Sequence, residues 1–205
     1  MFHNFYKVFL CVCLVGGSSA SAEQLQADKL QATINASLDV IYAEGTSGVS
    51  DQEKQSQVRQ RLEANYDLDV IIRRAIGRNW QLMDDGERTQ VLELVKRLVL
   101  KAYVNGLKGK TRPEVTLGKP LVITDKRMEI ESTVVLDGKT YFMLYRLGRV
   151  SSGWQIYDIV AENVSVVSNY REQLDDHFRR GNAAGLIARL QEILEKEDID
   201  EDTKI

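Results

Sequence analysis

The side chains that most often carry catalysis are scarce in this 205-residue sequence. Both cysteines, Cys11 and Cys13, lie near the N-terminus, and the only histidine after residue 22 is His177. His177 follows Asp175 and Asp176 in a polar stretch and lacks the further ligands that a metal site needs. Few side chains therefore remain that could form a nucleophile–base pair. We therefore expect no catalytic residue, no metal and no cofactor.

Two short motifs carry possible chemistry. Tyr157 and Asp158 are adjacent in an apolar stretch, and a tyrosine beside a buried carboxylic acid can form the oxyanion hole of an isomerase. Asp158 could equally bond a backbone amide or Arg171, which would make it structural. Gly138-Lys139-Thr140 ends like a phosphate-binding loop, but position 133 is threonine instead of glycine. We interpret that triplet as a hairpin turn, and an isomerase stays an alternative.

The first 22 residues have the pattern of a cleavable secretory signal peptide. Lys7 precedes an apolar run over residues 8–15, and Ala20-Ser21-Ala22 is a sequence that signal peptidase accepts. The apolar run is shorter than the roughly 20 residues that span a bilayer. We expect cleavage near Ala22 and a mature chain without cysteine, whose core alone must hold the fold.

The spacing of apolar residues predicts helices from Glu23 to about Lys110, because these residues recur every three or four positions. The last of the helices is apolar around more of its surface than one exposed face allows, so we expect it to be covered on two sides. Capping residues set the expected bounds of the four helices: Leu25 to Ile41, a second from the capping box Ser50–Glu53 to about Asn65, Leu68–Ile76 between Asp67 and Gly77, and Asp84 to about Leu107.

The period changes to that of strands from Arg112 to Ala161. We predict strands over residues 114–117, 121–124, 128–136, 139–149 and 153–161, and Asp137-Gly138 is a strong hairpin signal. Sequential hairpins imply an antiparallel meander. The fourth strand is apolar on both faces near Tyr141 to Leu147, so the sheet is expected to be covered or lined on both sides.

Helical spacing returns from Val164 to Phe178 and again from Leu186 to Leu194. No repeat or low-complexity linker divides the chain, so we expect residues 23–197 to form one α+β domain, followed by an acidic tail over residues 198–205. The 30 acidic residues outnumber the 27 lysines and arginines, which argues against a nucleic-acid-binding protein.

The excess of apolar positions has two explanations. A sheet packed on both sides by helices would form a filled core, as in a protein that serves only as an interaction module. An internal cavity for an apolar ligand would need the same excess. The pattern alone does not separate them.

Seven segments stand in a characteristic order and spacing: Tyr66–Asp69, Gly77–Trp80, Ala102-Tyr103, Gly153–Val160, Glu162–Ser165, Asn169–Arg171 and Gly185–Leu190. In this order and spacing the chain resembles the MlaC family of periplasmic phospholipid carriers, also called toluene-tolerance or ABC-transporter auxiliary proteins of Gram-negative bacteria. Asn163 stands where the family usually has glycine. The resemblance covers nearly the whole mature chain.

The resemblance implies a nuclear-transport-factor-like fold, in which a curved antiparallel sheet of about four to five strands carries an N-terminal helical subdomain and C-terminal helices. It implies a non-enzymatic carrier in the periplasm, with acyl chains in a pocket and the head group near solvent. The implied partners are phospholipid, an inner-membrane ABC transporter complex with its ligand-binding ring, and an outer-membrane lipoprotein–porin complex that serves outer-membrane lipid asymmetry. A hopanoid-linked carrier of the same family is a close variant.

The residues that would line such a pocket come from both helices and strands, although each could instead be ordinary core. We interpret Trp154, Asp158 and Asn169 as structural, since they would hold the last strand against the following helix. The predicted lining comprises Ile71, Val95, Val99 and Tyr103 from helices, Ile130, Val134, Tyr141, Met143 and Tyr145 from strands, and Val164, Val167 and Tyr170 to close it.

Overall fold

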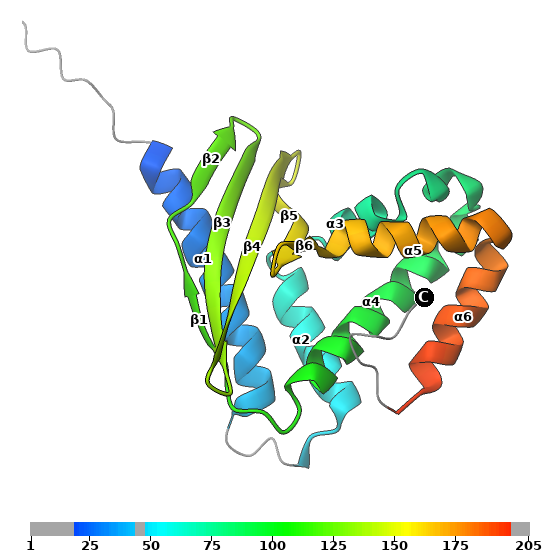
Figure 1. The fold of residues 1–205 in the computed structure, drawn as a ribbon, viewed down its shortest axis with the longest axis horizontal. Helices are drawn as coiled ribbons and strands as arrows, with labels where there is room; N and C mark the ends of the chain where they lie inside the picture. Colours follow the sequence, from blue (N-terminus) through cyan, green and yellow to red (C-terminus); the bar gives the residue numbers. More distant parts are fainter. Residues whose placement is uncertain (1–18, 44–47, 198–205) are drawn as a thin grey trace, which may run out of the picture.

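The computed structural model describes residues 19–43 and 48–197. Residues 1–18 of the predicted signal peptide and the predicted tail, residues 198–205, lie outside the described residues. Within them the chain forms six α-helices and one six-stranded antiparallel sheet, which confirms the α+β class. Figure 1 shows the sheet and α1 (Ser19–Tyr42) at one end of the molecule and α4 (Asp85–Leu107), α5 (Val166–Arg180) and α6 (Ala183–Glu195) toward the other.

The N-terminal helices begin where their capping residues predict. The Ser50 hydroxyl accepts a hydrogen bond from the Glu53 amide at 3.2 Å, and the Asp67 side chain caps the next helix. Asp84 and Glu87 form a complete capping box, with both reciprocal bonds present. The helices so started are α2 (Asp51–Glu63), α3 (Leu68–Ile76) and α4, with the 3-10 helix η2 (Gly77–Leu82) between the last two.

The capping box of α4 gives a first testable prediction. Replacing Asp84 with alanine removes the acceptor for the Glu87 amide, so we expect the free energy of unfolding to fall by about 1 kcal/mol. Urea denaturation of the purified protein measures the change. Asp85→Ala is the control, because that exposed side chain pairs only with Arg88 one turn on, and it should cost less than about 0.5 kcal/mol.

The sheet has the order β1-β3-β4-β5-β6, and β2 also pairs with β3. The hairpins from β3 to β5 confirm that part of the predicted meander, but β1 pairs with β3 instead of β2. β1 and β2 follow one another along the same edge of β3, and Gly118 holds the link between them against β3, since its amide donates to the Glu131 carbonyl at 2.7 Å. The strands are β1 (Glu114–Leu117), β2 (Leu121–Thr124), β3 (Arg127–Leu136), β4 (Lys139–Val150), β5 (Gly153–Ala161) and β6 (Val164–Ser165).

Strand β2 pairs with β3 alone and is exposed along its whole length. Three successive apolar side chains of this strand reach solvent, with Leu121 60 % exposed and both Val122 and Ile123 49 % exposed. The strand is thus an apolar edge of the sheet.

The two faces of the sheet are covered unequally. Leu30 of α1 packs against Met128, Ile130 and Leu147, which belong to one face. On the opposite face Phe142 is 63 % exposed, so the expectation that the sheet is covered or lined on both sides is wrong there. The cause is the position of α3 and α5, which contact the sheet through β5 and leave the outer face of β4 open.

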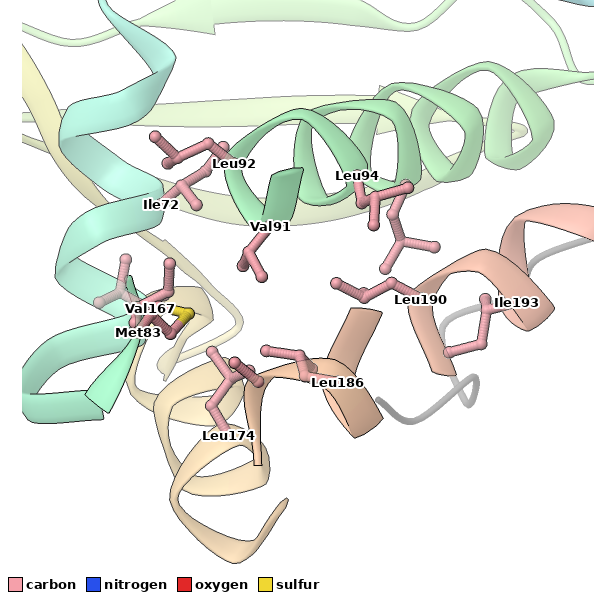
Figure 2. Close-up of a cluster of buried hydrophobic side chains, with 14 residues drawn as sticks. Ile72, Met83, Val91, Leu92, Leu94, Val167, Leu174, Leu186, Leu190 and Ile193 are labelled. Carbon is pink, nitrogen blue, oxygen red and sulfur yellow. The ribbon is translucent and has the colours of Figure 1, made fainter. Parts of the chain in front are cut away.

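Helix α4 is buried on two sides, as its wide apolar surface predicts. Val91 and Leu94 belong to a cluster built from α3, α4, α5 and α6 (Figure 2). Leu100 and Val104 belong to a second cluster, which α1 and α2 complete. The apolar excess of this helix is therefore largely explained by packing.

The segment before α5 differs from the prediction. Val164 was expected on a helix, but it lies in β6 and is 58 % exposed, and α5 begins only at Val166. Glu162 and Asn163 have φ angles of 47° and 67°, which turn the chain back so that residues 164–165 pair with β5. Asparagine tolerates this left-handed conformation better than most residues, so it can take the place of a glycine.

Candidate functional site

Helices α3, α4 and α5 converge with the end of β5 on a small apolar groove, which we call the helical groove. It has a volume of about 130 Å³, and its accessible wall is wholly apolar. Ile72, Val167 and Leu174 border the groove and also belong to the buried cluster drawn in Figure 2. The residues around the groove are Leu62, Leu68, Ile71, Ile72, Ala75, Ile76, Val95, Lys96, Leu98, Val99, Leu100, Ile159, Val166, Val167, Tyr170 and Leu174.

The structure brings five of the twelve predicted lining residues together in this groove. Val99 is 45 % exposed and so lies where the groove meets solvent, whereas Val167 is buried at its base. The five come from α3, α4 and α5: Ile71, Val95, Val99, Val167 and Tyr170.

The other seven predicted residues lie elsewhere. Ile130 and Tyr145 pack in the cluster beneath α1, and Tyr103 packs against the α1–α2 cluster. The remaining four belong to the sheet but do not border the helical groove: Val134 is partly buried, Met143 borders an open trough along β1, β3 and β4, and Tyr141 and Val164 are exposed.

Sequence reasoning missed groove residues that share a stripe with those it found. Leu68 and Ala75 lie one turn on either side of Ile71, and Val166 lies one turn before Tyr170. Their helical spacing was available as a signal. Ile159 could not be predicted from helical spacing, because it lies on β5 and nothing in the local sequence indicates that this residue meets three helices.

Lys96 is the charged residue of the groove, and its charge is compensated. Its side chain is 13 % exposed, with Nζ 2.6 Å from an Asp69 carboxylate oxygen and 3.7 Å from one of Glu63. The ammonium is thus held away from the groove by carboxylates at its rim, and the interior stays apolar.

Three buried or partly buried tyrosines lie in the apolar clusters that pack against α1, outside the helical groove. Burial raises the pKa of Tyr66, Tyr103 and Tyr145 above the usual value, and the pKa of Tyr103 is raised further by the neighbouring Tyr145. For Tyr145 a nearby Ser132 hydroxyl opposes part of this rise. Ionised groups are therefore disfavoured in this part of the molecule.

Tyr66 gives a second prediction, because its hydroxyl is buried with no hydrogen-bond partner among the described residues. Tyr66→Phe should raise the free energy of unfolding by about 1 kcal/mol at neutral pH. It should also reduce the loss of stability above about pH 10, where an unfolded tyrosine ionises and the buried one, with its raised pKa, does not. Urea denaturation near pH 7 and near pH 11 measures both effects.

Tyr42→Phe is the matched control for that measurement. The Tyr42 hydroxyl donates to the carbonyl oxygens of Leu107 at 3.2 Å and Thr111 at 3.1 Å. Its loss should lower stability at neutral pH, so a Tyr66→Phe protein that is destabilised to the same extent would contradict the prediction.

Asp158 has the surroundings of a structural carboxylate. Arg146 donates to it at 3.1 Å, the Val167 amide at 3.2 Å, and the Ser165 hydroxyl lies 2.8 and 2.9 Å from its two oxygens. Of the two structural partners that the sequence left open for Asp158, a backbone amide is found, whereas Arg171 donates to the Arg74 carbonyl instead. Asp158 thus fastens the first turn of α5 to β5 and β4, as its structural interpretation predicts.

Neither a metal site nor a spanning helix is found in residues 19–43 and 48–197. No group of three or more histidine, cysteine and carboxylate side chains there could hold a metal ion. No helix in those ranges has both the length and the apolar character needed to cross a bilayer.

Comparison with known proteins gives a family and a solved structure of similar fold. The family model described as "MlaC protein" matches residues 31–192. The solved phospholipid-binding protein from Ralstonia solanacearum, in complex with a phospholipid, has a TM-score of 0.71 and 22 % identity, covering 80 % of this chain and 94 % of that one. A cystatin-like domain from Nostoc punctiforme, with 18 % identity over 49 % of this chain and 70 % of that one, has a TM-score of only 0.29. No curated protein matches.

Proposed function

This chain belongs to the MlaC family, and from that premise we propose that it is a periplasmic carrier that holds the acyl chains of a phospholipid in the helical groove. The observation that carries the proposal is the groove itself, whose wall is wholly apolar and which opens to solvent beside Val99. The Ralstonia protein of similar fold was solved with a phospholipid, which supports the same ligand class here.

The groove is too small for whole acyl chains unless it widens. Ligand pockets usually measure about 300–1,000 Å³, and a cavity near 150 Å³ takes a molecule the size of benzene. At about 130 Å³ the groove admits only a few methylenes as it stands. We propose that α3 and α5 move away from α4 when lipid enters, since each buried methylene contributes about 0.8 kcal/mol toward that opening.

The carrier role needs no covalent chemistry. A two-chain lipid crosses water only when its tails are enclosed, and release at the destination needs a groove that opens again. The family implies exchange with an inner-membrane ABC transporter complex and an outer-membrane lipoprotein–porin complex, after a signal peptide has directed export. These partners and this localisation are part of the proposal.

Lipid analysis of the purified protein tests the proposal. Organic extraction followed by mass spectrometry should release phospholipid in a stoichiometric amount, and the stripped protein should take up labelled phospholipid from vesicles. The same spectra would separate a hopanoid ligand, which would replace phospholipid as the cargo. A lipid-free preparation that also takes up no phospholipid would contradict the carrier function.

A further inference from the structure

A second cavity, of about 370 Å³, lies on the other side of the α3–α5 contact from the helical groove. We call it the arginine cavity, because Arg74, Arg127, Arg146 and Arg171 border it together with Glu129 and Asp158. Val167 borders both cavities. The two spaces therefore meet at the side chain of one residue in the first turn of α5.

The carboxylates of the arginine cavity are already paired. Arg146 donates to Glu129 at 3.1 Å and to Asp158 at 3.1 Å, so this one guanidinium bridges both acids. Among the described residues no carboxylate lies within 4.0 Å of the guanidinium groups of Arg74, Arg127 or Arg171. Four cations against two anions leave a surplus of positive charge here, in a chain whose net charge is −3.

Two of the surplus arginines are held in place. The Arg74 guanidinium lies over the Tyr157 ring, 4.5 Å from its centre. Arg171 donates to the Arg74 carbonyl from Nε at 3.2 Å and also from Nη2. Gly77, at φ 59°, leaves room for this side chain, because a Cβ there would come within 3.3 Å of Arg171 Nε. Fixed guanidinium groups lose little entropy when they bind an anion.

Neighbouring residues on the same elements divide between the two cavities. Ala75 borders the groove and Arg74 the arginine cavity, and the same holds for Tyr170 and Arg171 on α5. On β5, Asp158 borders the arginine cavity and the next residue, Ile159, borders the groove. Helices α3 and α5 would contact the acyl chains, and each thus carries an arginine next in sequence to a residue that borders the groove.

We propose that the arginine cavity binds the phosphate group of the carried lipid, which makes the cargo an anionic phosphodiester instead of any apolar molecule. The proposal rests on the proposed function, since it needs tails in the helical groove. Guanidinium groups bind phosphate through paired, charge-assisted hydrogen bonds, which is the recognition that this cavity offers. Free phosphate shares that chemistry and is distinguished by the experiment.

The test offers lipid-free full-length protein two lipids with the same tails. Vesicles contain dioleoylphosphatidylglycerol and dioleoylglycerol in equal amounts, and mass spectrometry measures which lipid the re-isolated protein holds. We expect the wild type to be enriched in the phospholipid, and Arg74→Gln/Arg127→Gln to reduce that enrichment about fivefold with total lipid unchanged. The control Arg61→Gln/Arg180→Gln removes the same charge from exposed positions outside the cavity and should leave the enrichment unchanged.

The outcomes separate the two proposals. Equal loading of both lipids in wild type and variants would overturn the phosphate site and leave the carrier function standing. Absence of any lipid uptake would contradict the carrier function itself. Inorganic phosphate is titrated into lipid-free protein in a second arm, followed by arginine Nε–H NMR. Phosphate binding that the double variant abolishes, without a preference for the phospholipid, would assign the site to free phosphate and overturn the lipid assignment.

Discussion

Replacing Val99 with aspartate is expected to reduce the amount of phospholipid bound by about tenfold. Val99 is 45 % exposed at the mouth of the helical groove, so the new carboxylate can stay hydrated in the empty protein. When acyl chains enter, the carboxylate must lose water against methylene groups, and a cost of about 1.4 kcal/mol already gives a tenfold loss. Uptake of labelled phospholipid from vesicles measures the amount bound by the variant and by the wild type.

Val122→Asp is the matched control for that variant. Val122 is a valine of almost equal exposure, 49 %, but it lies on β2 and away from the groove. Both variants should fold with nearly wild-type stability, as thermal denaturation would verify. Equal uptake by the Val99 and Val122 variants would show that acyl chains do not pass this wall.

Asp158→Ala is expected to lower the free energy of unfolding by about 3 kcal/mol. The carboxylate is 8 % exposed and is the common acceptor for Arg146, Ser165 and the Val167 amide. Its removal takes one of the two carboxylates from the half-buried Arg146, which keeps Glu129, and leaves the Val167 amide in the first turn of α5 without this acceptor. Urea denaturation of the wild type and the variant measures the loss.

Two further variants sharpen this test. Asp176→Ala removes an exposed carboxylate that pairs with Arg179 one turn on, and it should cost less than about 0.5 kcal/mol. Asp158→Asn keeps one acceptor oxygen and should fall between the wild type and the alanine variant. A loss below about 1 kcal/mol for Asp158→Ala would refute the structural role and return the residue to the isomerase hypothesis.

Local signals in the sequence predict the elements well. Asp67 and Gly77 bracket α3 because capping is decided within a few residues of a helix end. The Asp137-Gly138 hairpin has φ angles of 49° and 77° at its two turn residues, the conformation that this dipeptide favours. These features need no knowledge of the remaining chain.

Contacts between elements that are far apart in the sequence could not be predicted. An alternating pattern tells that Ile130 and Tyr145 share a face, but it does not tell that α1 covers that face and fills it. Val99 and Tyr170 were found because each lies on an apolar helical stripe, yet only the folded chain brings them together. For the same reason the ion pair of Asp158 with Arg146 was missed, since cross-strand register decides it.

The apolar edge formed by β2 has a consequence for the behaviour of the protein in concentrated solution. A half-exposed edge strand offers unpaired backbone groups to a second chain, and hydrogen bonding between such edges joins sheets edge to edge in aggregates. Lys119 and Lys126 flank the strand, and Pro120 in front of it has no amide hydrogen to donate. These three residues act as gatekeepers, so colloidal stability depends on side chains that contribute little to the fold itself.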